Sequence, residues 1–172
     1  MATLPTFRVP KENGSQIAPY LHTGLDYAGP FFVKQGRGHG RAKRWLALFT
    51  CMNYRGVHLE IVHSLETQSF LMAMQRFLSS NASPKYLYMD NQRTFIKGEE
   101  CINRWLKESD VHVRLQNKHP DIQFHYIPPS SPNFGGTWES MVKLVKRGLY
   151  DVIKPGLMTD EELLTAIKQV EA

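Results

Sequence analysis

Three acidic residues occupy places where a carboxylate is unusual. Asp26 lies within the apolar stretch GLDYAGPFFV, Asp90 closes the stretch KYLYMD, and Glu139 follows the Gly-Gly pair of PNFGGTWES. A carboxylate beside apolar residues is costly unless it is paired, hydrogen-bonded or bound to a metal ion. Three carboxylates brought together favour a divalent cation, and hard oxygen ligands suit Mg²⁺ or Mn²⁺. Two such ions can clamp the attacking and leaving oxygens of a phosphodiester.

Each acidic residue also has an ordinary structural explanation. An Asp at the end of a strand often serves a turn, and a Glu in the first turn of a helix interacts favourably with the helix dipole. Glu139 shares one helical face with Lys143, Lys146 and Tyr150, at i+4, i+7 and i+11. Cations on that face would hold phosphates next to the carboxylate. A solvent-exposed Glu–Lys pair is the alternative.

A basic segment surrounds the glycine-rich turn QGRGHGR. Its five cations fall within eleven residues: Lys34, Arg37, Arg41, Lys43 and Arg44. The segment is a place to hold a nucleic acid or a solvated hairpin tip, and the sequence leaves both open. It is no phosphate-binding P-loop, because no Gly-Lys-Ser/Thr opens a helix there.

The hydrophobic periodicity predicts an α/β fold. Strands are expected at 24–33, 44–52, 55–64, 85–90 and 122–127, and helices from Thr67 as N-cap, at 95–108, at 137–153 and after the capping box Thr159-x-x-Glu162. Residues 128–136 are expected to form a loop and 109–121 a polar connection. This order predicts a five-stranded mixed sheet flanked by helices, with its first three strands antiparallel. It is the ribonuclease H-like arrangement.

Composition limits the class of protein. The 172 residues are 42% hydrophobic and 22% charged, as in one globular domain, and the net charge of +5 suits a polyanionic partner. Cys51 and Cys101 form no CxxC pair, so a zinc site is not expected, and two buried thiols are the simple interpretation. No apolar run has the length of a membrane span, and no secretion signal is visible. Residues 1–19 are expected to form an arm or linker and 20–172 the domain.

Five blocks, in order, strongly resemble the integrase catalytic core of BEL/Pao-type LTR retrotransposons. They are GLDYAGPF, WLALFTC, RGVHLEIVHSLETQSFL, YMDNQRTF and PPSSPNFGGTWESMVKLVKRGL, and the resemblance spans about residues 20–171. It implies a ribonuclease H-like core with a D, D, E triad at Asp26, Asp90 and Glu139, separated by 90 − 26 − 1 = 63 and 139 − 90 − 1 = 48 residues.

The resemblance also implies an activity. The triad would hold two Mg²⁺ or Mn²⁺ ions, and the enzyme would trim the 3′ end of the element and join it to target DNA. Lys143 and Lys146 would face the DNA end, with Tyr150 and Asn91 as further DNA contacts, beside a mobile loop at 128–136. The expected partners are DNA and further copies of the chain, with neither a membrane nor a small-molecule substrate. The chain would be made in the cytoplasm and act in the nucleus.

Three departures from the family keep an alternative open. Gln92 stands where the family has the Gly of DNG, Asn133 stands where His is common, and the family continues beyond QVEA towards an LNSRP-like segment. A piece of a polyprotein, truncated at its C-terminal end, fits the last of these. A decayed or domesticated nucleic-acid-binding module is the alternative function. A ribonuclease H would need a further carboxylate on the first helix, where Glu66 is the acid nearest to it.

Overall fold

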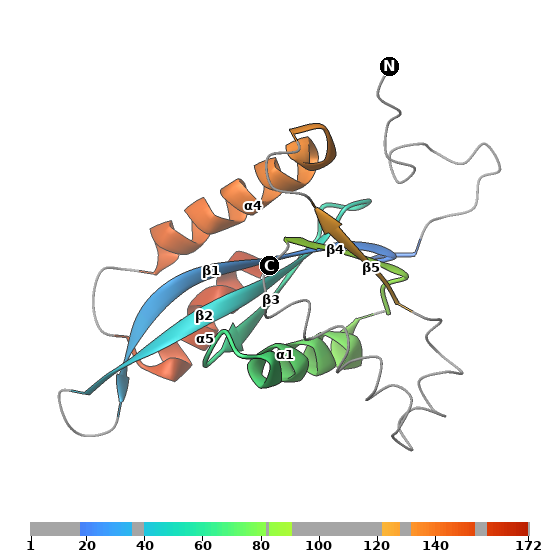
Figure 1. Ribbon diagram of the computed structural model, residues 1–172. Coiled ribbons are helices and arrows are strands. Elements are labelled where there is room, and N and C mark those ends of the chain that lie inside the picture. The colour runs from blue at the N-terminus through green and yellow to red at the C-terminus, as the bar shows by residue number, and fades with distance from the viewer. Residues whose placement is uncertain are drawn as a thin grey trace, which may run out of the picture.

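The computed structural model describes residues 18–35, 40–81, 83–90, 122–127, 132–153 and 158–171. Within these ranges only the backbone is described at positions 67, 90, 124, 126–127 and 132–139. The expected helix at 95–108, the polar connection at 109–121 and nearly all of the expected arm lie outside the described residues. The described chain is a mixed α/β structure with an open sheet and helices on both of its faces (Figure 1).

The strands of the described chain form one sheet in the order β3-β2-β1-β4-β5. β1 (His22–Gln35), β2 (Gly40–Cys51) and β3 (Val57–Val62) form an antiparallel meander, which confirms that expectation. β4 (Tyr86–Asp90) pairs parallel with β1, and β5 (Gln123–Ile127) pairs parallel with β4. Residues 46–51 of β2 are all buried because helices cover both faces of the sheet, which explains their continuous apolar run.

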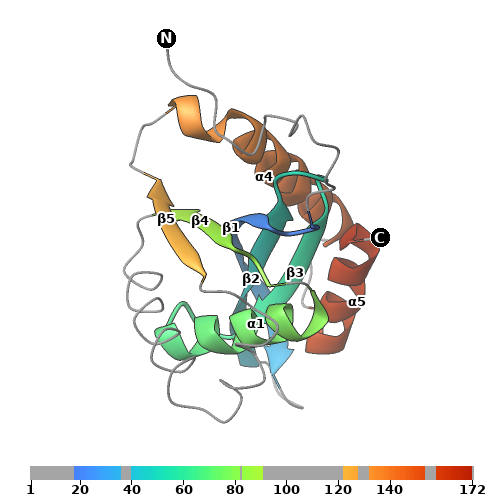
Figure 2. The same ribbon diagram turned by 90° about the vertical axis from the view of Figure 1, so that its right-hand side faces the viewer.

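Helices form the two outer layers, as Figure 2 shows. α1 (Thr67–Ser80) covers one face, and its core with the sheet includes Phe49, Phe70, Phe77, Leu87 and Met89. α4 (Pro132–Val152) and α5 (Asp160–Glu171) lie on the other face, over a core that includes Leu46, Leu48, Leu149, Leu163 and Ile167. None of the described helices contains a stretch long and apolar enough to cross a bilayer.

The start of α4 corrects the expected loop at 128–136. Residues 132–136 are helical, so only 128–131 separate β5 from α4, and these four lie outside the described residues. The two glycines before Thr137 suggested a loop because glycine is a poor helix former. Pro132 supplies the opposing signal, since the fixed φ of proline and its missing N–H suit the first position of a helix.

The structure tests two predictions about the N-terminal ends of helices. The capping box that opens α5 is confirmed: Thr159 N donates to Glu162 Oε2 at 2.7 Å, and Glu162 N donates to Thr159 Oγ1 at 3.1 Å. Thr67 is not the N-cap of α1. The carbonyl of Glu66 accepts the first helical bond, from Phe70 N, so Glu66 is the capping residue. Within α5, Leu163 and Ile167 are buried, whereas Leu164 is 47% exposed.

Candidate functional site

Asp26 lies in β1 on the face of the sheet that α4 and α5 cover. Its neighbours Leu25 and Tyr27 point into the core beneath α1, so strand alternation turns Asp26 to the opposite face, where its pairing partner Leu48 also lies. Asp26 Oδ1 accepts a hydrogen bond from Tyr27 N at 2.7 Å. Oδ2 accepts one from Lys146 Nζ at 2.8 Å, and the two side chains are 24% and 32% exposed. The carboxylate is therefore partly buried and paired.

α4 brings Lys146 to this carboxylate through its packed face. Val142 and Leu149 are buried, and Lys146 lies beside them on the helix surface that faces β1. Of the three residues on the predicted face, Lys143, Lys146 and Tyr150, only Lys146 is seen to contact Asp26. Lys143 is exposed, and Tyr150, 59% exposed, has its ring 5.7 Å from that of Phe31. The sequence pattern indicated the face and gave no sign of the Asp26–Lys146 ion pair.

The other two predicted site residues are described through their backbones alone. Met89 of β4 pairs with Leu25 of β1, so Asp26 and Asp90 are the next residues along two adjacent parallel strands. Glu139 is the eighth residue of α4, about two turns from its start at 3.6 residues per turn, where one turn was expected. The difference follows from the earlier start of the helix. Asn91 and Gln92 lie outside the described residues.

Asp26 offers the kind of oxygen ligand that a hard cation binds. Carboxylate oxygens are the ligands that Mg²⁺ and Mn²⁺ prefer. An ammonium group already lies against one of these oxygens, so positive charge is stabilised at this point. Among the side chains that the structure describes, no three His, Cys, Asp or Glu residues gather into a metal-binding group. Of the predicted triad, Asp26 is the one residue whose side chain the structure describes.

An aromatic cluster that no sequence pattern indicated shares this face of the sheet. The His22 ring stacks on Tyr86 at 4.6 Å, and its Nδ1 lies 3.2 Å from the Tyr88 hydroxyl. His125 of β5 stacks on Tyr88 at 5.0 Å from the other side. Burial lowers the pKa of His22, with smaller contributions from the charges of His125 and Lys85. Along β4 the cluster ends at Tyr88, two residues before Asp90.

The basic segment around the β1–β2 turn divides into two parts. The sequence left Arg44 open between a nucleic-acid contact and a solvated hairpin tip, and neither interpretation describes its position. It is 8% exposed, and its guanidinium binds Asp160 of α5 in a bidentate pair, with Nε–Oδ1 at 2.7 Å and Nη2–Oδ2 at 2.9 Å. Its role is to attach α5 to β2. Lys34, Arg41 and Lys43 are exposed, whereas Arg37 lies outside the described residues.

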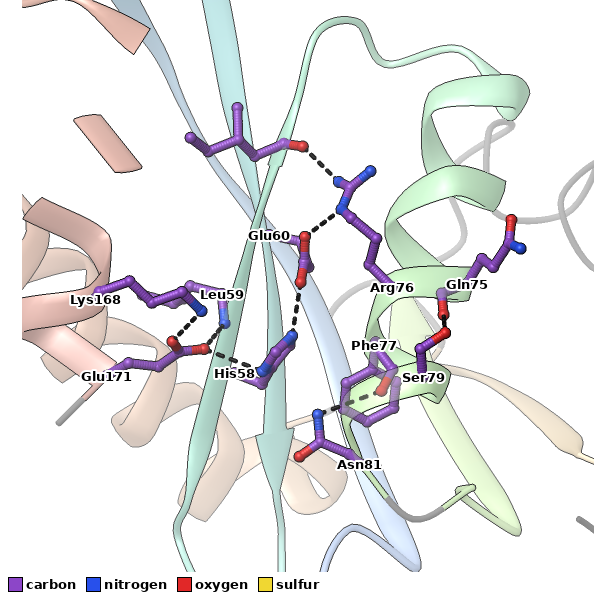
Figure 3. A network of polar contacts seen from close by, with 11 residues as sticks. His58, Leu59, Glu60, Gln75, Arg76, Phe77, Ser79, Asn81, Lys168 and Glu171 are labelled. Atoms are coloured by element: carbon purple, nitrogen blue, oxygen red, sulfur yellow. Dashed lines mark hydrogen bonds and ion pairs between the residues drawn. The ribbon is translucent and has the colours of Figure 1, made fainter. Parts of the chain in front are cut away.

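A second polar network joins α1, β3 and α5 at the edge of the sheet (Figure 3). His58 Nε2 lies 2.8 Å from Glu60 Oε1, and Nδ1 lies 3.1 Å from Glu171 Oε1, so the ring lies between the two carboxylates. Arg76 of α1 completes the network by donating to Glu60 and to the Ile61 carbonyl. Burial alone would raise the pKa of Glu60. The hydrogen bonds from His58 and Arg76 outweigh it and lower that pKa.

Comparison with known proteins identifies the kind of fold. No family model and no curated protein sequence matches the chain. Solved structures do match. The HTLV-2 integrase catalytic core domain in complex with magnesium, in its trimeric form, is 15% identical with a TM-score of 0.54 over 89% of this chain and 86% of that one. The BIV integrase catalytic core domain is 11% identical, with a TM-score of 0.51 over 86% and 81%.

A chain of the simian T-cell lymphotropic virus intasome, solved with the PP2A regulatory subunit B56 gamma, also matches. It is 14% identical with a TM-score of 0.55 over 88% of this chain, which spans about half of that one (48%). The chain has an integrase-like fold. This confirms the expected α/β architecture with a mixed sheet and helices on its faces. At these identities the likeness concerns the fold and leaves the chemistry to the site residues.

Proposed function

We propose that this chain is the catalytic core of a BEL/Pao-type retrotransposon integrase, a DDE polynucleotidyl transferase. The observation that carries the proposal is the ion pair between Asp26 and Lys146. It attaches β1, with the first acidic residue, to the helix that carries the third. The integrase-like fold supports the same assignment.

The backbone positions of the three acidic residues are consistent with a shared site. Asp26 and Asp90 continue the parallel register of β1 and β4, and strand alternation gives both positions the same parity. Glu139 precedes Lys146 by seven residues, which is about two turns, so the two positions share one face of α4. Lys146 contacts Asp26 from that face. This spacing supports the proposed role of Glu139 as the third acidic residue.

In this proposal Asp26, Asp90 and Glu139 hold two Mg²⁺ or Mn²⁺ ions. When bound, the ions would polarise the scissile phosphodiester and stabilise the charge that develops on its oxygens. Lys146 and Lys143 bind the backbone phosphates of the DNA end, and Lys146 exchanges its pairing with Asp26 for a phosphate oxygen. Tyr150 and Asn91 are proposed as further DNA contacts.

The two reactions are displacements at phosphorus. In the first, water attacks near the end of the element, one P–O bond forms, another breaks, and a 3′-OH is released. In the second, that 3′-OH attacks a phosphodiester of target DNA and joins the strands. Each step exchanges one P–O bond for another, so neither requires ATP. Joining two ends favours more than one copy of the chain, and related cores are described in dimeric and trimeric forms.

A joining assay with the triad variants tests the proposal. A labelled duplex with a recessed 3′ end is incubated with supercoiled plasmid and Mg²⁺ or Mn²⁺. Asp26→Asn, Asp90→Asn and Glu139→Gln should each lower joining by about a hundredfold or more, the scale of losing a preorganised electrostatic group. Asp151→Asn, an exposed acid on α4, is the control and should keep full activity.

Equal activity in wild type and triad variants would refute the proposal. Absence of joining by wild-type protein with either ion, together with intact DNA binding, would favour the alternative of a non-catalytic nucleic-acid-binding module. Cleavage of an RNA–DNA hybrid in preference to DNA would indicate a ribonuclease instead. In the described structure Glu66 is exposed at the start of α1 and hydrogen-bonds to Ser64, so its position gives that reading no support.

A further inference from the structure

β1 and β2 continue beyond the rest of the sheet as a two-stranded ribbon. Pairing of β2 with β3 ends at Trp45, and pairing of β1 with β4 covers residues 22–25. Residues 31–35 of β1 and 40–44 of β2 pair only with each other within the sheet. Figure 1 shows the two strands running together past the end of β3. The ribbon begins after an irregularity between Ala28 and Phe31, where Gly29 has a φ of 119°.

The two faces of this ribbon differ in burial. The inner face packs on α5. Phe31 and Val33 are buried in the core with that helix, Arg44 pairs with Asp160, and Lys34 N donates to the Met158 carbonyl at 2.7 Å. The outer face carries four side chains, all exposed: Phe32, Lys34, Arg41 and Lys43. Register places Phe32 opposite Lys43 and Lys34 opposite Arg41.

The outer face gathers three positive charges that no described ion pair neutralises. Cations that lie directly opposite each other on adjacent strands destabilise the pairing, and Lys34 and Arg41 are such a pair. Within the described chain, no ion pair or hydrogen bond involves the side chains of Lys34, Arg41 or Lys43. The pKa of Glu162 is lowered mainly by its hydrogen bonds with Thr159, and the charge of Lys34 makes a smaller contribution. The charge therefore suits an external anion.

We propose that this outer face, defined by Phe32, Lys34, Arg41 and Lys43, binds the phosphate backbone of DNA at a place separate from the Asp26 site. Arg41 and Lys43 are two residues apart on one strand, about 6.6 Å at 3.3 Å per residue, a spacing that allows them to contact different phosphates. Lys34 stands about 26 Å along β1 from Asp26 by the same rise, and on the opposite face of the sheet. The contact requires neither a metal ion nor catalysis.

DNA is favoured over an acidic protein by the context of the face. The chain carries a net charge of +5, and its fold is integrase-like. The exposed ring of Phe32, at 47% exposure, lies among the cations, which suits contact with a sugar or an unpaired base. The binding test therefore includes duplex DNA, the same strand unpaired, and polyglutamate as a competitor.

The test measures DNA affinity of the full 172-residue chain in EDTA at several salt concentrations. The probe is a labelled duplex of about 30 base pairs, with no sequence from any element. Each neutralised phosphate contributes about −0.9 to the slope of log affinity against log salt, so Arg41→Gln/Lys43→Gln should reduce the slope by about 1.8. Between 50 and 200 mM salt the double variant should then lose about twelvefold less affinity than wild type.

A matched pair controls for net charge. Arg55→Gln/Arg147→Gln also removes two positive charges, and both residues line a cavity between α4, α5 and the start of β3. This pair should leave the slope within experimental error of wild type. Equal losses for both pairs would show that only net charge matters and would overturn the proposal. So would an unchanged slope in Arg41→Gln/Lys43→Gln.

Stability and competition complete the test. Without DNA, Arg41→Gln should raise the urea midpoint slightly because it removes the repulsion with Lys34, while the same variant binds DNA more weakly. A parallel fall in stability and affinity would instead mark a folding defect and count against the proposal. If polyglutamate competes as well as DNA at equal charge, the face serves an acidic protein and the DNA proposal is wrong. Metal-dependent joining is not measured, so failure here is distinguishable from failure of the proposed catalytic function.

Discussion

The ammonium of Lys146, on α4, lies 2.8 Å from Oδ2 of Asp26, on β1. The second oxygen of that carboxylate accepts the backbone N–H of Tyr27. Two partly exposed charges of this kind add little stability, about 0.2–1 kcal/mol in most proteins. The pair therefore adds little to the stability of the fold, and its main consequence for the site is a positive charge against one oxygen of Asp26.

Removing the ammonium should strengthen divalent binding. Lys146→Gln removes the cation that pairs with Asp26. A metal ion then has no ammonium group to displace and none to repel it. If the pair is worth about 1 kcal/mol, Mg²⁺ or Mn²⁺ should bind about fivefold more tightly by calorimetry. Asp26→Asn should abolish the same binding.

Lys143→Gln is the matched control, because it removes one charge from the same helix at a residue with no ion pair in the described structure. Its effect on metal affinity should be the smaller of the two. Weaker metal binding in Lys146→Gln than in wild type would contradict the interpretation of Lys146 as a competing cation.

The edge network predicts a dependence of stability on pH. Glu60, whose side chain is 13% exposed, has a folded-state pKa below the ordinary glutamate value because His58 and Arg76 donate to its carboxylate against the opposing effect of burial. A carboxylate of this kind adds stability above the pKa of the unfolded chain. That contribution is lost as the pH falls through the lower, folded-state value.

Glu60→Gln should therefore cost about 1–2 kcal/mol at pH 7, and the difference from wild type should shrink as the pH falls below 4.5. Urea unfolding at a series of pH values measures both quantities. Glu161→Gln, an exposed acid in the first turn of α5, is the reference and should lose only its helix-dipole contribution, about 0.3–1 kcal/mol at pH 7. A wild-type advantage that is constant down to acid pH would show that the charge of Glu60 does not supply it.

Much of the fold followed from sequence because local signals agreed. The strands alternate or run apolar as their burial requires, and the capping box at Thr159 opens a helix where one was expected. The start of α4 was missed because the Gly-Gly pair and Pro132 give opposite local signals. No local rule decides between them, since the hydrogen bonds and packing of the whole helix settle the outcome.

The site shows the same limit. Asp26 was identifiable from one charge within an apolar strand, and Lys146 from its spacing after Glu139. That the two form an ion pair depends on how α4 crosses the sheet, which periodicity does not encode. The role of Arg44 was left undecided for the same reason: beside four other cations it resembles a surface charge, while its partner Asp160 is 116 residues away.

The capping box provides a local test of α5. Thr159→Ala removes the hydroxyl that accepts from Glu162 N, and it should destabilise the chain by about 1 kcal/mol. Thr165→Ala is the control, since that hydroxyl is exposed and donates to the Glu161 carbonyl within the same helix. Urea unfolding compares the two. Equal losses would indicate that the cap contributes nothing beyond a generic threonine effect.

The attachment of α5 to β2 rests on a pair with unequal exposure. The Arg44 side chain is 10% exposed and that of Asp160 is 50% exposed. Asp160→Ala would leave a nearly buried guanidinium without its carboxylate, so we expect a loss of about 2 kcal/mol in unfolding free energy. Glu161→Ala removes a neighbouring acid from the same helical turn and controls for the helix dipole, worth about 0.3–1 kcal/mol. If both variants lose the same amount, the dipole accounts for the effect. A larger loss in Asp160→Ala that disappears in the Arg44→Met background would assign it to the pair itself, because a methionine there needs no partner.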